Sequence, residues 1–115
     1  RDSFAVSPGH TLVIPKRHVA SFFDLNPEEV SAIMTLITEE KTLLDQEFSP
    51  DGYNIGVNVG PAAGQGIFHV HVHIVPRYTG DVENPQGGVR HVIPKNAHNV
   101  FGAVEHNLRA KPRGI

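Results

Sequence analysis

The stretch GQGIFHVHVHIVPRY, residues 64–78, places a histidine at every second position, as His69, His71 and His73. Side chains alternate between the two faces of a β-strand, so a strand here puts all three imidazoles on one face. The other face then carries apolar side chains: Phe68, Val70, Val72 and Ile74. We therefore predict a strand that packs its apolar face against a helix and presents its histidines on the opposite side.

A helix able to cover this strand is predicted over residues 27–48. Asn26 suits the N-cap, Pro27 suits the first helical position, and Glu29 has the spacing of a capping box. Apolar residues then recur at helical spacing along one face: Val30, Ile33, Met34, Ile37, Leu44 and Phe48. This face predicts a helix that lies on a sheet rather than one surrounded by solvent.

Other strands are predicted where apolar or alternating runs lie between turn residues. Residues 10–14 follow a Ser-Pro-Gly turn, residues 53–60 alternate after the turn at 49–52, and the segment VRHVIP, residues 89–94, is a candidate for a short strand. Residues 95–115 are polar and receive no assignment.

Length and composition predict a single domain over residues 1–115. The chain is 39% hydrophobic and 19% charged, and its formal net charge is −2, which gives no general attraction to nucleic acid or to an anionic membrane. No apolar run approaches the roughly 18 residues of a membrane-spanning helix. With no cysteine, disulfides, cysteine zinc sites and thiol nucleophiles are excluded. We expect a cytoplasmic protein, and because the chain opens on Arg1 without Met we expect an N-terminal segment to be missing.

The histidine row permits three interpretations. It can be a solvent-facing strand side, a metal site, or a catalytic group in which a neutral imidazole acts as nucleophile and its neighbours handle protons. His69 and His73 lie about 13 Å apart along an ideal strand, at about 3.3 Å per residue, and Zn–N bonds measure only about 2.0–2.1 Å. One ion therefore cannot bind all three rings unless the strand bends, and a two-histidine site needs another ligand such as His10.

The loop before the row favours the catalytic interpretation. Residues 60–66 are rich in glycine and alanine, so backbone N–H groups can approach a ligand closely, as they do around phosphate oxygens. A loop of this kind that leads directly into three imidazoles suggests a phosphate site beneath a nucleophile.

At these residues the sequence resembles the histidine triad (HIT) family of nucleotide hydrolases and transferases. HVHVHIV, residues 69–75, matches the family signature His-φ-His-φ-His-φ-φ, in which φ is hydrophobic. The resemblance to the bacterial branch continues in several segments: AVSPGHTLVIPKRH at 5–18, GYNIGVNVG at 52–60, AAGQ at 62–65, VPRY at 75–78 and GGVRHVIP at 87–94.

The resemblance implies roles for four histidines. His71 matches the nucleophile that forms a covalent nucleotidyl-imidazole intermediate. His73 matches the residue that contacts the scissile phosphate and assists the leaving group, while His69 and His10 support this array. No role is assigned to His18, His91, His98 or His106.

The resemblance also implies substrate contacts. Asp2 matches a carboxylate that binds the ribose hydroxyls, and Asn58 matches a polar residue that reaches the phosphate region. The loop positions next to the phosphate are Gly64, Gln65, Gly66 and Ile67, with His73 beside them. In the family the base pocket comes largely from the segment before Asp2, which we expect to be missing.

Together these observations predict an α+β fold: an antiparallel sheet of about five strands with one long helix packed on one face. The predicted function is cleavage of a phosphoanhydride or phosphoramidate bond at the α-phosphate of a purine nucleotide, in a dinucleoside polyphosphate or an adenylylated substrate. A nucleotidyl transferase and a non-catalytic nucleotide-binding domain are the alternatives, and His73 at the last triad position favours hydrolysis. We expect a homodimer, no metal in the site and no required cofactor, although a divalent ion can accompany a polyphosphate substrate.

Overall fold

The computed structural model describes residues 1–98 and divides the chain into two compact units, Arg1–Asp81 and a second that begins at Val82. Most of the segment 95–115 that receives no assignment from the sequence, His106 included, lies outside the described residues. Within residues 1–98, no helix has the length and apolarity needed to cross a membrane.

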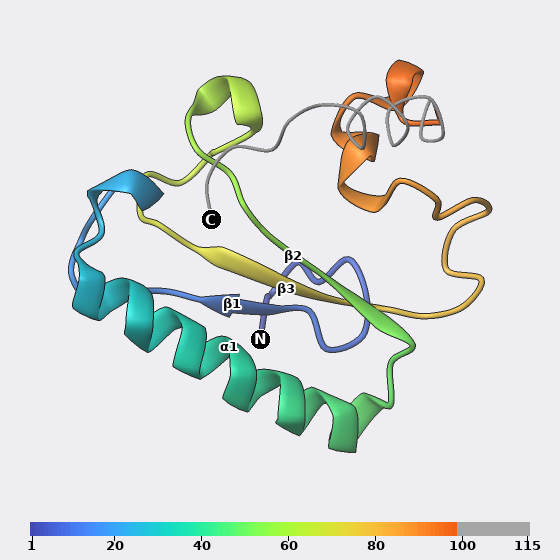
Figure 1. The fold of residues 1–115 in the computed structure, drawn as a ribbon, viewed down its shortest axis with the longest axis horizontal. Coiled ribbons are helices and arrows are strands. Elements are labelled where there is room, and N and C mark those ends of the chain that lie inside the picture. The colour runs from blue at the N-terminus through green and yellow to red at the C-terminus, as the bar shows by residue number, and fades with distance from the viewer. Residues whose placement is uncertain (99–115) are drawn as a thin grey trace, which may run out of the picture. The chain divides into compact units, whose positions relative to one another are not determined.

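The first unit contains a three-stranded antiparallel sheet (Figure 1). Its strands are β1 (Thr11–Val13), β2 (Gly52–Val57) and β3 (Val72–Arg77), in the order β1-β3-β2. The register places Leu12 beside His73 on one side and Gly56 beside His73 on the other. The prediction of an antiparallel sheet is confirmed, but the described residues contain three strands instead of about five.

The helix α1 (Pro27–Phe48) begins and ends where the sequence predicts. The Asn26 side chain accepts from the N–H of Glu29 at 2.8 Å, and the Glu29 carboxylate accepts from the N–H of Asn26 at 2.9 Å. This capping box satisfies two donors that an uncapped helix start leaves unpaired. The chain leaves α1 through Ser49 in the left-handed conformation.

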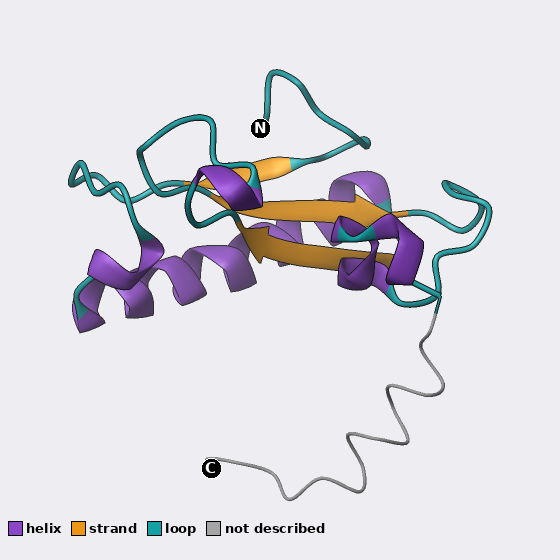
Figure 2. Ribbon diagram, turned by 90° about the horizontal axis from the view of Figure 1, so that it is seen from above, coloured by secondary structure: helices purple, strands orange, loops and turns teal. Residues whose placement is uncertain are grey.

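One face of the sheet packs on α1 (Figures 1 and 2). The core joins three helix residues to three strand residues: Ile33, Ile37, Leu44, Val13, Val72 and Ile74. Val30 and Met34, which the helical pattern places on the apolar face, are exposed. The narrow sheet explains the difference, because a three-residue β1 and a six-residue β2 leave the edge of the helix stripe uncovered.

The histidine segment differs from the prediction at its start. Ladder pairing begins only at Val72, so His69 and His71 precede β3. The N–H of Val70 instead donates to the carbonyl of Val19 at 2.7 Å. The predicted alternation still holds from Val70 to Ile74, whose apolar members are buried, whereas Phe68 is 52% exposed and does not join the apolar face.

The second unit contains no strand within residues 82–98. The prediction of a short strand over residues 89–94 is wrong, because this segment forms the 3-10 helices η3 (Gly88–Val92) and η4 (Pro94–Asn96). Gly87 and Gly88 both adopt positive φ angles, which turn the chain out of an extended path, and Pro94 lacks the N–H that a strand ladder needs.

Candidate active site

A pocket of about 300 Å³ lies in the first unit. Its lining includes all three members of the histidine row, one carboxylate and four apolar side chains: His69, His71, His73, Asp2, Phe4, Leu12, Ile14 and Ile67. Leu12 and His73 are neighbours in the β1–β3 register, on the sheet face opposite the buried Val13 and Val72. The sheet therefore buries one face on α1 and places chemically reactive side chains on the other.

His71 is held by a backbone carbonyl. Its Nδ1 lies 2.9 Å from the carbonyl oxygen of His69. A carbonyl only accepts hydrogen bonds, so Nδ1 must carry the hydrogen and Nε2 must hold the free lone pair. The half-buried ring thus has a defined tautomer, with Nε2 as its nucleophilic nitrogen.

His10 and His73 form a hydrogen-bonded chain whose direction is set by Val6. The N–H of Val6 donates to His10 Nδ1 at 3.1 Å, so the hydrogen of neutral His10 lies on Nε2. His10 Nε2 then donates to His73 Nδ1 at 2.9 Å. His73 consequently carries its own hydrogen on Nε2, as a donor. His10 itself is buried, so water does not compete for these bonds.

Burial lowers the pKa of His73, and the neighbouring His10 and His71 lower it further. The Asp2 carboxylate opposes this shift but is the smallest of the four influences. The lowered pKa of His73 agrees with its hydrogen bond to His10, because a proton added to Nδ1 of His73 would face the N–H of His10. His73 is therefore a neutral donor at neutral pH.

His69 acts through its backbone as well as its ring. Its Nε2 donates to the carbonyl of Pro15 at 2.9 Å, and its own carbonyl is the acceptor for His71. Its ring centroid lies 4.9 Å from that of His18, a residue for which the sequence indicates no role. The ring contacts fix the backbone of His69, which in turn fixes the tautomer of His71.

Asp2 lines the pocket close to the His10–His73 pair. Its N–H donates to the carbonyl of His10 at 2.8 Å, and Oδ1 accepts from the N–H of Phe4 at 2.9 Å. Oδ2 lies 3.5 Å from His10 Nε2. The carboxylate keeps acceptor capacity on both oxygens, as binding a ribose diol requires.

The loop residues divide into two groups. The N–H groups of Gly64 and Gln65 donate within the loop, to Pro61 and Gly60, and the buried Gln65 side chain bonds Gly60, Ala20 and Ile67. These two residues shape the loop, so phosphate contacts from their N–H groups would require those bonds to exchange. Ile67 lines the pocket, next to Gly66. Asn58 follows β2 and is half-buried, but it is not among the residues that line this pocket.

Sequence reasoning missed three lining residues, Phe4, Leu12 and Ile14. A signal is present in β1 and directly after it, where Leu12 and Ile14 are apolar although they alternate with the buried Thr11 and Val13. Apolar side chains on both faces of a strand indicate that both faces are covered or bind a ligand. Phe4 has no such signal, because it lies in a short exposed segment.

Asp2, His10 and His73 offer three possible metal-ligand atoms within 4.8 Å of one another. A ligating nitrogen must present a lone pair to the ion. His10 Nε2 instead carries hydrogen, because Nδ1 accepts from Val6. Metal binding here would require His10 to break that bond or lose a second proton, so the cluster fits a metal ion poorly and fits a hydrogen-bond chain well.

In the second unit, His91 and His98 pair with each other, their ring centroids 5.0 Å apart. His91 Nε2 also donates to the carbonyl of Gln86. These contacts give both residues structural partners within residues 82–98.

The chain matches known proteins over most of the first unit. Residues 1–80 match the family model described as HIT domain. The chain is 44% identical over 77 residues to an uncharacterized 16.1 kDa HIT-like protein of Mycoplasma pneumoniae, covering 67% of this chain and 54% of that protein. It is 42% identical over 76 residues to the asymmetrical bis(5'-nucleosyl)-tetraphosphatase of Schizosaccharomyces pombe, covering 66% of this chain and 42% of that enzyme.

The fold also resembles that of a solved structure. The crystal structure of a hypothetical histidine triad nucleotide-binding protein from Sulfolobus tokodaii aligns with a TM-score of 0.66 and 35% identity, covering 69% of this chain and 53% of that one. The chain spans about half the length of the curated relatives it matches. Because the family model matches well over half of the sequence, the resemblance is confirmed: the chain belongs to the HIT domain family.

Proposed function

We propose that this chain hydrolyses a phosphoanhydride or phosphoramidate bond at the α-phosphate of a nucleotide, through a covalent nucleotidyl intermediate on His71. One observation carries the proposal. The carbonyl of His69 holds the hydrogen of His71 on Nδ1, so Nε2 keeps a lone pair in a residue that lines the pocket. This is the arrangement that a histidine nucleophile needs.

In the first step, the Nε2 lone pair attacks the α-phosphorus and the bond to the leaving group breaks. The electron pair of that bond goes to the leaving atom, which accepts a hydrogen bond from Nε2–H of His73: a phosphate oxygen departs as an anion, and a nitrogen takes up a proton from solvent and departs as an amine. His71 becomes a phosphorylated imidazolium that still carries hydrogen on Nδ1. The His69 carbonyl, 2.9 Å away, stabilises this positive charge.

In the second step, water attacks the same phosphorus and the P–N bond breaks. The electron pair returns to Nε2 of His71, the water loses a proton to solvent, and a nucleoside monophosphate leaves. The attacking water takes the position that the leaving group has vacated. Nε2–H of the neutral His73 can therefore donate to this water as it donated to the leaving group.

The rest of the pocket suits a nucleotide. Leu12, Ile14 and Ile67 provide apolar surface for a flat base, while Asp2 provides acceptors for the ribose hydroxyls. The printed name of the Schizosaccharomyces pombe relative describes an enzyme that acts on bis(5'-nucleosyl) tetraphosphates. We therefore propose dinucleoside polyphosphates and adenylylated compounds as the first substrates to test.

The test is mass spectrometry of protein quenched during turnover with diadenosine tetraphosphate and with an adenosine phosphoramidate. We expect an adenylyl adduct on His71 in the unchanged protein and none in His71→Ala, which should lose activity by several orders of magnitude while still binding AMP. His98→Ala, in the second unit, is the matched control and should form the adduct normally.

Products distinguish the alternatives. Release of AMP with oxygen from labelled water supports hydrolysis, while ADP formed from added inorganic phosphate would instead indicate transfer. A His71→Ala variant that keeps more than about a tenth of the activity would contradict the covalent mechanism.

A further inference from the structure

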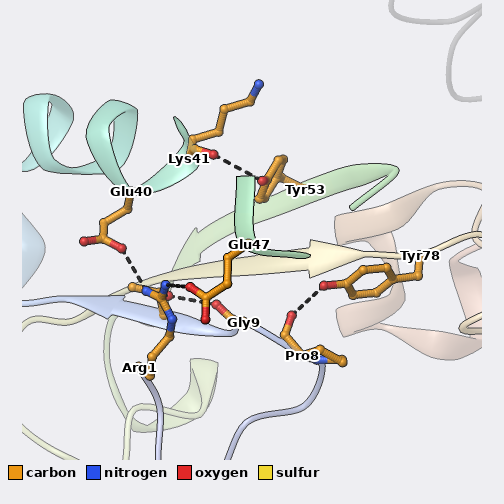
Figure 3. A network of polar contacts seen from close by, with 9 residues as sticks. Arg1, Pro8, Gly9, Glu40, Lys41, Glu47, Tyr53 and Tyr78 are labelled. Carbon is orange, nitrogen blue, oxygen red and sulfur yellow. Dashed lines mark hydrogen bonds and ion pairs between the residues drawn. The ribbon is translucent and has the colours of Figure 1, made fainter. Parts of the chain in front are cut away.

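Arg1 contacts the C-terminal half of α1 and β1 (Figure 3). Its Nη1 donates to Glu40 at 2.9 Å and to Thr11 Oγ1 at 3.0 Å, and its Nη2 donates to Glu47 at 3.0 Å. The guanidinium carbon lies 6.0 Å from the centroid of the Phe48 ring. One side chain thus contacts two acidic residues, a strand and an aromatic ring.

The two glutamates are arranged for a forked cation. Glu40 and Glu47 are seven residues apart, which is two helical turns or about 10 Å along the axis, and they face the same side. A guanidinium can donate in two directions at once and so bridge this gap, whereas an ammonium is a compact point charge. Arg1 is not among the residues that line the pocket, so this bridge lies outside the candidate site.

Arg1 is also the chain neighbour of Asp2, whose carboxylate-bearing side chain lines the pocket. Residues 3–6 are exposed, so apolar burial does not anchor this segment. Beyond it the chain is fixed again, because Ser7 Oγ donates to the carbonyl of Pro76 and Tyr78 OH donates to that of Pro8, the latter shown in Figure 3. The segment that carries Asp2 is therefore held at both ends, by Arg1 and by the turn at residues 7–9.

The carboxylate of Asp2 has few protein contacts of its own among the described residues. Its N–H donates to the carbonyl of His10, and within residues 1–98 its carboxylate accepts from Phe4, in the same exposed segment, and lies 3.5 Å from His10. Segments with little buried surface open at a low free-energy cost, which external contacts can raise. The contacts of Arg1 join this segment to α1, the longest element of the unit.

We propose that Arg1 is a positioning residue for Asp2, and that the Arg1–Glu40–Glu47 bridge sets the preference of the pocket for a ribose over a 2′-deoxyribose. The inference rests on the proposed function in one respect, the assignment of Asp2 to the ribose. Beyond that assignment, the inference states that sugar recognition depends on the ion pairs of Arg1 with Glu40 and Glu47, which lie outside the pocket lining and do not contact the nucleotide.

The experiment is calorimetry of the full chain with AMP and 2′-deoxy-AMP. In the unchanged protein AMP should bind more tightly, and Asp2→Ala should lower AMP affinity by about 10- to 100-fold, the effect of losing hydrogen bonds to a charged group. Arg1→Met should lower AMP affinity by about three- to tenfold, since the carboxylate remains but is less well placed, and should lower 2′-deoxy-AMP affinity by less, because that ligand has only the 3′-hydroxyl to offer Asp2. The double variant Glu40→Gln/Glu47→Gln should reproduce Arg1→Met.

A double-mutant cycle separates positioning from a general structural effect. If Arg1 acts through Asp2, Arg1→Met added to Asp2→Ala changes neither affinity further. Lys41→Met is the matched control, because it also removes a cation and an ion pair, Lys41–Asp45, from α1 and should leave the AMP preference intact.

Ionic strength provides a second readout. Added salt screens the exposed ion pairs of Arg1, so the preference for AMP over 2′-deoxy-AMP should decrease as salt rises. Both ligands carry the same phosphate, so the direct effect of salt on phosphate binding cancels in the ratio.

Three results would overturn the inference. An AMP preference that is unchanged in both Arg1→Met and Lys41→Met, but lost in Asp2→Ala, would leave the ribose assignment standing and reject the role of Arg1. Additive effects in the cycle would likewise reject it. Equal binding of the two nucleotides by the unchanged protein would reject the ribose assignment itself, and the inference with it.

Discussion

A single backbone N–H, that of Val6, determines where the hydrogens lie on two histidines. Because it occupies Nδ1 of His10, the only hydrogen of that ring lies on Nε2, and His73 must accept it on Nδ1. The hydrogen of His73 is thereby placed on the opposite nitrogen. His71 is fixed in the opposite sense by the carbonyl of His69. Two neighbouring imidazoles thus present different nitrogens: Nε2 of His71 keeps a lone pair, as the proposed nucleophile needs, and Nε2 of His73 carries a hydrogen.

This arrangement predicts how His10→Phe behaves. Phenylalanine keeps the ring volume but removes the donor to His73, so kcat should fall by roughly 10- to 100-fold, at or below the range for general acid catalysis. The loss should be largest for substrates with poor leaving groups and small for activated aryl leaving groups, which need no donor. Steady-state kinetics across such a series is the measurement, with His98→Phe as the control. An equal loss for every leaving group would contradict the role of the His10–His73 chain.

Stability should depend on pH through His73. Its pKa is lowered in the folded state by burial and by its histidine neighbours, so below about pH 6.5 the unfolded chain binds more protons at this residue than the folded one. The contribution is complete above about pH 6.5 and is lost as the pH falls from there toward the lowered pKa. Urea unfolding of the unchanged protein and of His73→Gln at several pH values tests this. The variant should lose less stability on acidification, and identical pH slopes would refute the assignment.

The turn at residues 7–9 packs closely against α1 because Gly9 has no side chain. Gly9 has a φ of +88°, and a Cβ there would lie 2.9 Å from Phe48 Cδ2 and 3.0 Å from Leu44 Cδ2. Gly9→Ala should therefore destabilise the fold by about 2–4 kcal/mol, from the strained backbone and from crowding against the helix. Urea unfolding measures this loss. Gly52→Ala is the control, since a Cβ at Gly52 would meet no atom within 4 Å and the φ of that residue is ordinary; equal losses would show that the close approach at Gly9 is unimportant.

The elements that can be predicted well from the sequence are those with local determinants. The bounds of α1, Pro27 and Phe48, are predictable because its capping box and apolar spacing lie within the helix itself. The predicted start of β3 is too early, because the extent of a strand depends on a partner distant in the sequence, and Val70 bonds Val19 instead of a strand. The short strand expected at 89–94 fails for a local reason, since Gly87 and Gly88 bend the chain.

In the candidate site, too, local features can be predicted from the sequence and tertiary contacts cannot. The alternating histidines are enough to identify the pocket, whose lining includes all three. Their different hydrogen-bond partners are not predictable, because Val6 and Pro15 approach them only in the folded chain. The same holds for the link from Arg1 to Glu40 and Glu47, which joins residues about 40 positions apart. The sequence pattern identifies the residue types, whereas tertiary contacts determine the tautomer and orientation of each residue.

The first unit leaves an apolar edge that predicts self-association. Tyr53 and Val57 of β2 pack toward the core, so Ile55 between them points to the same face, where it is 48% exposed. Val30 and Met34 of α1 are also exposed, and β2 lies at an edge of the described sheet. An exposed strand edge that carries an exposed apolar side chain, as Ile55 on β2, favours pairing with a second chain, and Val30 and Met34 add exposed apolar surface on α1.

We therefore expect a homodimer, as the resemblance to the HIT family implies. Sedimentation equilibrium should give about twice the chain mass of 12.6 kDa. Ile55→Lys and Met34→Glu should each weaken the dimer, because either places a charge in an apolar contact, where desolvation without a partner is costly. Phe23→Glu is the matched control, since it adds a charge at another exposed apolar residue, in the 3-10 helix η1 (Phe22–Asp24). A chain that sediments as a monomer at high concentration, or a Phe23→Glu variant that dissociates as readily as Ile55→Lys, would show that this edge is not the interface.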